Sequence, residues 1–175
     1  MRQSILRYFI SLLLVSLCIC SATSIFIISG SMKEDSERKM MYSVKLIEYN
    51  LDYSKDLNTQ IETLNPLAFS DDTRISVIDE KGKVLADTYK KDISSNHLKR
   101  EEVQQALHSS NHEGYAMRRS ETTNQPLLYA AYYKDNHIIR LSIPYSGVWG
   151  YFPELAPAFA ISILISILFS YIVAR

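Results

Sequence analysis

The segment RISVIDEKGKVLAD, residues 74–87, decides the fold class of this 175-residue chain. Apolar and polar side chains alternate with a period of two in Arg74–Asp79, which predicts a half-buried β-strand. Glu80-Lys81-Gly82 supplies a tight turn, and Lys83–Asp87 supplies the second strand of a hairpin. The segment therefore places an antiparallel sheet in the middle of the chain.

Three more strands and a short helix follow this hairpin. The apolar residues of Arg100–Ser109 have helical spacing. Alternation returns in three later segments, which we predict to be strands: Gly114–Ser120, Leu127–Lys134 and His137–Pro144. Asp135-Asn136 supplies the turn between the last two. This order of elements predicts an α+β domain with a five-stranded antiparallel sheet covered by helices.

Upstream of the hairpin, residues Met32–Leu64 predict one long helix that ends before Pro66. This helix is apolar on two faces, and such a helix must bury both. One face carries Met40, Val44, Ile47 and Leu51; the other carries Tyr42, Leu46, Tyr49 and Tyr53. We expect the tyrosine face to pack on the domain and the Met40 face to form the seam of a parallel homodimer. The alternative is that the domain wraps around the helix.

Two charge-free apolar stretches, Tyr8–Met32 and Leu155–Ala174, bracket the chain. Each has the roughly 20 apolar residues that a bilayer-spanning helix needs. Arg2 and Arg7 precede the first stretch without any acid, and Arg175 follows the second, so we expect both termini in the cytoplasm. The predicted organisation is an N-tail with transmembrane helix 1 (1–32), an extracytoplasmic domain (33–152) and transmembrane helix 2 (153–175).

A cleaved signal peptide with its apolar core at Ile5–Ile19 is the alternative for the first stretch. Apolar character resumes at once in Ile25–Ile28, which favours an uncleaved anchor. Both cysteines of the chain, Cys18 and Cys20, lie inside this stretch. The domain outside the membrane therefore has no disulfide to stabilise it and depends on an apolar core.

The charge pattern and the motifs exclude several function classes. All 19 acidic residues lie between Lys33 and Glu154, together with 16 Lys and Arg, so the middle of the chain is slightly acidic and does not suit nucleic acid. His108 and His112 have metal-ligand spacing but no third ligand beside them. No nucleophile motif or glycine-rich nucleotide loop is present. We therefore expect no catalytic residue, no metal site and no cofactor.

The hairpin segment is one of several that together resemble a known family. The others are Asn96-His-Leu-Lys-Arg-Glu-Glu-Val103, Arg119-Ser-Glu-Thr122, Leu128-Tyr-Ala-Ala131 and the terminal Tyr171-Ile-Val-Ala-Arg175. In this order they resemble bacterial sensor histidine kinases of the phosphate-regulon (PhoR-like) type. Lys99 and Glu101 depart from the family pattern, which often has an acid and a proline there, so ligand specificity is not carried over.

The resemblance implies a PAS-like or single-Cache domain between two helices of the bacterial plasma membrane. In the family, the second helix leads into a HAMP coiled coil, a helix with the phospho-accepting histidine and an ATP-binding domain. The given sequence ends at Arg175 before these parts, so we expect a sensing module that is either a fragment of a longer protein or a stand-alone remnant. It would act on a response regulator only through the missing kinase region. The alternative is a two-pass structural or interaction protein that binds another envelope protein.

The resemblance also implies a small-molecule site on the sheet face that the helix and loop cover. Arg118, Tyr129, Tyr132 and Arg140 have suitable side chains, because aromatic rings form walls and guanidinium groups bind carboxylate or phosphate. In the alternative reading, Tyr129 belongs to the core and Arg118 is solvated, and the domain senses a protein or no ligand. We expect Asn96, His97 and Arg100, which match the family motif, to cap a helix and anchor a loop rather than to contact ligand.

Overall fold

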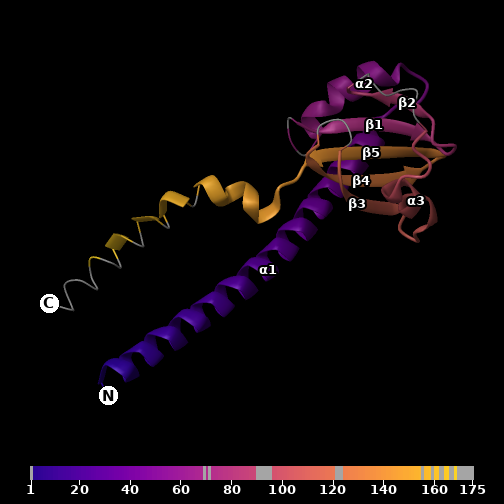
Figure 1. The fold of residues 1–175 in the computed structure, drawn as a ribbon. Coiled ribbons are helices and arrows are strands. Elements are labelled where there is room, and N and C mark those ends of the chain that lie inside the picture. The colour runs from indigo at the N-terminus through magenta and orange to yellow at the C-terminus, as the bar shows by residue number, and fades with distance from the viewer. Residues whose placement is uncertain are drawn as a thin grey trace. The chain divides into compact units, whose positions relative to one another are not determined.

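The structure is a computed structural model that describes residues 2–68, 70, 72–89, 96–120, 124–154, 156–158, 160–161, 164–165 and 168. The chain divides into two compact units. Residues 34–145 form the first, and residues 1–33 together with 146–175 form the second. Figure 1 labels the helices and strands of both units.

A five-stranded antiparallel sheet forms the centre of the larger unit, as the sequence predicts. The strands lie in the order β2-β1-β5-β4-β3, so the last strand of the chain is the central one (Figure 1). Their bounds are β1 Arg74–Asp79, β2 Val84–Asp87, β3 Glu113–Arg119, β4 Pro126–Lys134 and β5 His137–Pro144. Asp135 and Asn136 both have positive φ, as a two-residue hairpin turn between right-twisted strands requires.

Helices α1 (Arg2–Asn50) and α2 (Leu57–Leu64) contribute to the apolar core on one face of this sheet. Met40, Val44 and Ile47 of α1 have no exposed surface. They pack with every second residue of the central strands: Ile75 and Val77 of β1, Leu128 and Ala130 of β4, and Ile139, Leu141 and Ile143 of β5. Alternation along the strands thus gives the sheet one continuous apolar face.

The predicted dimer seam is wrong, because its residues belong to this core. Met40, Val44 and Ile47 are fully buried within the chain, and Leu51 is half-buried against the same cluster. The opposite side of α1 is the exposed one, with Tyr42 72% and Tyr49 81% exposed. The two stripes have the same spacing, and the side chains of the Met40 stripe fill the core while Tyr42 and Tyr49 keep their hydroxyls in water.

The predicted helix over Met32–Leu64 is wrong in its continuity, because α1 ends at Asn50 and α2 begins at Leu57. Asp52 accepts hydrogen bonds from the backbone and hydroxyl of Ser54, and Asp56 accepts one from the backbone N–H of Thr59. Aspartate side chains that bind nearby N–H groups compete with helical bonding and favour caps and turns. A 3-10 helix, Asn65–Leu67, follows α2.

Helix α3 (Glu101–His108) covers part of the other face of the sheet. Val103 and Ala106 are buried there in a smaller apolar cluster with Ile78, Val84, Ala131 and Ile138. The helix approaches β3 closely at Gly114, where an added Cβ would overlap the carbonyl oxygen of Glu102 and crowd the backbone nitrogen of Ala106. The remainder of this face is polar.

The smaller unit contains the N-terminal part of α1 and a 3-10 helix, Gly147–Tyr151. Over the described part of the chain, no helix combines the length and the hydropathy needed to cross a bilayer. Most of the second predicted span, Leu155–Ala174, lies outside the described residues. The two spans therefore stay predictions from the sequence.

Candidate functional site

The candidate site is a set of polar side chains on the α3 side of the sheet, which we name the polar face. It consists of Ser76 on β1, Asp87 on β2, Arg118 on β3, Tyr129 on β4, and Arg140 and Ser142 on β5. In β1, β4 and β5, the residues that alternate with these polar ones point to the opposite face of the sheet and belong to the apolar core. Five of these six residues, all except Arg118, are less than 9% exposed. Buried polar groups in folded proteins are normally hydrogen-bonded.

Arg140 is the central residue of the polar face and only 3% exposed. Its Nη2 donates a hydrogen bond to Ser76 Oγ at 3.1 Å, and its Nη1 donates to His97 Nδ1 at 2.6 Å. Since a guanidinium only donates, this ring nitrogen of His97 must be the unprotonated acceptor. The Nε of Arg140 is buried and has no hydrogen-bond partner among the described residues. A buried N–H without a partner is costly, so the polar face offers an unused donor.

Glu102, on the first turn of α3, carries a fully buried carboxylate. Arg118 binds it with two parallel bonds, Nη1 to Oε2 at 2.5 Å and Nη2 to Oε1 at 2.9 Å. Arg140 Nη1 lies 3.6 Å from Oε1. Burial raises the pKa of Glu102, but the hydrogen bonds and charges of the two arginines outweigh it, so its pKa is lowered overall. The acid is therefore ionised and shared between two guanidinium groups.

A second ion pair joins Arg74 and Asp87 at the β1–β2 edge of the polar face. Arg74 Nε lies 2.9 and 3.0 Å from the two oxygens of Asp87. The same carboxylate accepts hydrogen bonds from Ser76 Oγ at 2.7 Å and from the backbone N–H of Tyr89 at 2.9 Å. Asp87 is completely buried, and these four bonds satisfy it.

Tyr129 forms an aromatic wall between the two arginines that were predicted to bind ligand. Its ring centroid lies 3.7 Å from Cζ of Arg118 and 5.7 Å from Cζ of Arg140, which is the geometry of cation–π contacts. Burial lowers the pKa of Arg140 to about 10, with Glu102 acting in the opposite direction, so Arg140 remains charged at neutral pH. The structure thus brings Arg118, Tyr129 and Arg140 together.

Tyr132, the fourth predicted ligand residue, is not part of the polar face. It packs against the apolar core on the α1 side, and Lys45 Nζ lies 5.1 Å from its ring centroid. Tyr129 and Tyr132 are three residues apart on β4, so they point to opposite faces of the sheet. The grouping of Tyr132 with the arginines is therefore wrong.

Sequence reasoning missed the acids of the polar face. Glu102 lies at the start of the predicted helix and Asp87 at the end of a predicted strand, and neither is among the predicted ligand residues. The strand register places Asp87 and Arg140 beside Ser76. Loop anchoring by Asn96 and His97 agrees with the prediction, because the backbone N–H of His97 donates to Gly82 O at 2.7 Å and Asn96 Nδ2 donates to Lys81 O at 2.8 Å. The predicted capping role of Arg100 is wrong, because Arg100 is the N-cap residue of α3 but makes no side-chain capping hydrogen bond. The side-chain bond of His97 to Arg140 had no signal in the sequence.

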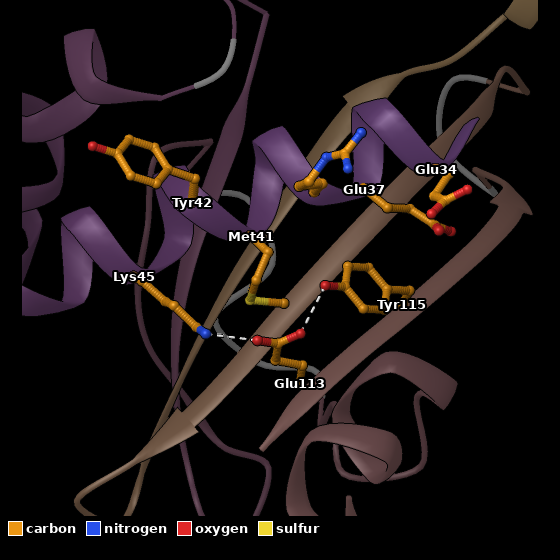
Figure 2. A pocket seen from close by; sticks show the side chains of 8 residues that line it. Glu34, Glu37, Met41, Tyr42, Lys45, Glu113 and Tyr115 are labelled. Atoms are coloured by element: carbon orange, nitrogen blue, oxygen red, sulfur yellow. Dashed lines mark hydrogen bonds and ion pairs between the residues drawn. The ribbon is translucent and has the colours of Figure 1, made fainter. Parts of the chain in front are cut away.

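A groove of about 470 Å³ on the other side of the larger unit is the main competing site (Figure 2). It lies between α1 and β3, and Lys45, Glu113 and Tyr115 are among the residues that line it. Glu113 accepts hydrogen bonds from Lys45 Nζ at 2.6 Å and from Tyr115 Oη at 2.9 Å. Both carboxylate oxygens of Glu113 thus have a hydrogen-bond partner within the groove. On the polar face, by contrast, the buried Nε–H of Arg140 has none among the described residues.

The described residues contain no group of three side chains that could hold a metal ion. His108 Nδ1 lies 2.8 Å from the carbonyl oxygen of Gln104, and His112 contacts the edge of the Tyr133 ring. The two histidines thus have separate local contacts.

No family model matches the chain, and no curated protein matches it. Solved structures do. The ligand-binding domain of the Campylobacter jejuni chemoreceptor Tlp3 with L-valine is 18% identical, with a TM-score of 0.50 over 75% of this chain and 61% of that chain. The sensory domain of Tlp3 with isoleucine gives the same four values. The Bacillus subtilis YkuI protein, which has an EAL domain, is 15% identical over 76% of this chain and 37% of its own, with a TM-score of 0.47.

These likenesses concern the fold and part of each protein. The chain spans between 37% and 61% of the length of the solved structures named above. The long N-terminal helix and five-stranded antiparallel sheet described here are similar to those of ligand-binding sensory domains. At this level of identity, the comparisons establish a sensory-domain type of fold.

Proposed function

We propose that the chain is the sensing module of a bacterial two-component sensor histidine kinase of the PhoR-like type. In this proposal, residues 33–152 form a PAS-like or single-Cache domain outside the cell membrane, and Tyr8–Met32 and Leu155–Ala174 cross the membrane. The fold similarity to ligand-binding sensory domains supports the sensing role. The charge pattern and the two apolar stretches support the topology.

The observation that carries this function is the buried donor of Arg140 on the polar face. The described residues there include three guanidinium groups, of Arg74, Arg118 and Arg140, and two carboxylates, of Asp87 and Glu102. One positive charge and the Arg140 Nε–H remain uncompensated among them. A small molecule with a carboxylate or phosphate group would supply an acceptor for this N–H. The amino acids bound to Tlp3 carry such a carboxylate.

Transmission to the membrane follows from the connections of the larger unit. Helix α1 leads from the sheet toward the first apolar stretch, and β5 leads through Gly147–Tyr151 toward the second. Ion pairs link α1 to the strands, with Lys45 Nζ 2.6 Å from Glu113 and Lys134 Nζ 2.9 Å from Glu48. Packed elements move between discrete arrangements, so a ligand-dependent shift of the strands would also displace α1. The output would be a HAMP and kinase region.

The exposed side of α1 is the surface we now propose for homodimer formation, in place of the buried Met40 seam. Tyr42 and Tyr49 are exposed and Leu46 lies between them at helical spacing. Two copies anchored in the same membrane would pair these stripes in parallel. The alternative function, an interaction module for another envelope protein, would use the same stripe to bind that partner.

A ligand screen on the purified full chain in detergent micelles tests the sensing proposal. We expect at least one of a panel of amino acids, dicarboxylates and phosphates to raise the melting temperature and to bind in isothermal titration. Arg140→Ala should abolish this binding, and Arg119→Ala, which changes an exposed neighbour of Arg118, should leave it intact. The proposal fails if no panel member binds, or if binding is insensitive to Arg140.

A further inference from the structure

We propose that Arg118 and Arg140 form a carboxylate-binding site that Glu102 of the same chain occupies as an internal ligand. A small molecule bearing a carboxylate would then bind by taking the place of the Glu102 side chain. The exchange step rests on the proposed sensing function, whereas the existence of the carboxylate site does not. The consequence is that ligand binding and the position of α3 are linked.

The Glu102 side chain is held in the way that a bound carboxylate ligand is held. It is completely buried, has two parallel bonds to Arg118, and has the guanidinium of Arg140 on one of its oxygens. Tyr129 closes the site by packing against both arginines. Two guanidinium groups and an aromatic wall are the usual means by which proteins bind a free carboxylate. Glu101, the preceding residue, is exposed.

Glu102 is also separable from the contacts that hold α3 on the sheet. Val103 and Ala106 are fully buried in the apolar cluster with Ile78, Ala131 and Ile138. These contacts lie on the apolar half of the face and do not involve the carboxylate. Displacing the Glu102 side chain would therefore loosen the start of α3, while Val103 and Ala106 keep the helix on the sheet.

An incoming carboxylate could gain a bond that Glu102 does not make. Glu102 leaves the Nε–H of Arg140 without a partner, although Nη1 of the same guanidinium lies 3.6 Å from its Oε1. A free molecule is not tethered to a helix and can reach both Arg118 and the Nε edge of Arg140. The Arg118 side chain is 27% exposed, which provides access from solvent. The exchange replaces one carboxylate with another, so the buried charge stays the same.

The loop before α3 is also linked to the displacement of Glu102 by a ligand. Arg140 Nη1 binds His97 at the beginning of the loop, and Glu102 follows five residues later on the helix. Arg140 thus contacts both ends of the segment from His97 to Glu102. A ligand on Arg140 would loosen the helix end of this segment first, and the backbone bond from His97 to Gly82 would keep its other end in place.

Chemical rescue tests the carboxylate site directly. Glu102→Ala removes the equivalent of one acetate from the side chain, so sodium acetate is the matching probe. In the full chain in micelles, we expect Glu102→Ala to lower the melting temperature and acetate to restore part of it saturably, relative to sodium chloride at equal ionic strength. Wild type and Glu101→Ala should show no such acetate response. Adding Arg118→Ala to Glu102→Ala should remove the rescue.

Equal stabilisation by acetate and chloride, or a Glu102→Ala variant as stable as wild type, would overturn the proposal. Glu102→Gln provides a second test if Glu102→Ala does not fold, because it keeps the side-chain shape and removes the charge. Line broadening of ¹³C-labelled acetate should then be stronger with Glu102→Gln than with wild type, and equal broadening would contradict the site. A failed ligand screen with successful acetate rescue would reject the sensing function and retain the carboxylate site.

Discussion

At the residue scale, Arg140 distinguishes this sheet from one with two apolar faces. Its neighbours in the central strand, Ile139 and Leu141, are core residues, while Arg140 points to the other side and organises Ser76, His97 and Glu102. Burying a guanidinium is expensive unless acids and acceptors surround it. The chain provides most of these partners but leaves Nε without one, which is why we assign binding to this residue.

The lowered pKa of Glu102 predicts a specific pH dependence of stability. A carboxylate with a lower pKa in the folded state than its ordinary value of 4.5 stabilises the fold above that value. This contribution is lost as the pH falls through the folded pKa. We therefore expect the free energy of unfolding of wild type to decrease as the pH falls below the ordinary Glu value of 4.5.

Urea denaturation of the full chain in micelles at a series of pH values measures this effect. Glu102→Gln should be less stable than wild type at neutral pH and should show a weaker decrease on acidification. Glu101→Gln, at the exposed neighbouring position, should keep the wild-type slope. Parallel curves for wild type and Glu102→Gln would show that Glu102 does not contribute to acid sensitivity.

At the element scale, the position of α3 depends on the missing side chain of Gly114. A methyl group there would overlap the carbonyl oxygen of Glu102 and crowd the backbone of Ala106, so α3 would have to move away from β3. We expect Gly114→Ala to lower the free energy of unfolding by about 1–3 kcal/mol, as overpacking does. It should also weaken the binding of any ligand that depends on Arg118 and Arg140.

Thermal and chemical denaturation of Gly114→Ala measure the loss of stability. Gly30→Ala is a matched control, because nothing lies within 4 Å of a Cβ added there. Wild-type stability of Gly114→Ala would mean that α3 is not held as closely to β3 as described.

The two stripes of α1 predict different crosslinking. In a background with Cys18 and Cys20 replaced by Ser, we expect Tyr42→Cys and Tyr49→Cys to form disulfide-linked dimers in membranes, because both positions are exposed. Val44→Cys should not crosslink, since Val44 is fully buried. Crosslinking at position 44 without crosslinking at 42 and 49 would restore the original seam and contradict the described packing.

The same helix shows what the sequence could and could not predict. Alternation located every strand to within one or two residues, because it reflects burial on one face. Periodicity identified both stripes of α1. It could not predict which stripe packs on the sheet, because the two have the same spacing. The break at Asp52 was missed because local capping bonds override a continuous helical pattern. The ion pair of Arg118 and Glu102 could not be predicted from local sequence patterns, because it forms only when α3 packs close to β3.

At the scale of the whole molecule, the proposed topology predicts which positions are accessible from outside the cell. With Cys18 and Cys20 replaced by Ser, a membrane-impermeant maleimide should label Asn111→Cys in intact cells, because Asn111 lies in the exposed loop after α3. Gln3→Cys, in the predicted cytoplasmic tail, should react only after the cells are permeabilised. Labelling of Gln3→Cys in intact cells, or none of Asn111→Cys, would contradict the two-pass arrangement.

Hydrogen–deuterium exchange with and without the strongest ligand of the screen tests the central claim most directly. If the polar face binds the ligand and releases Glu102, exchange in the full chain should decrease around Arg118 and Arg140 and increase in the first turn of α3. The α2 helix, which packs on the opposite face, should not change. Protection confined to the groove between α1 and β3, with unchanged exchange on the polar face, would contradict the proposed site.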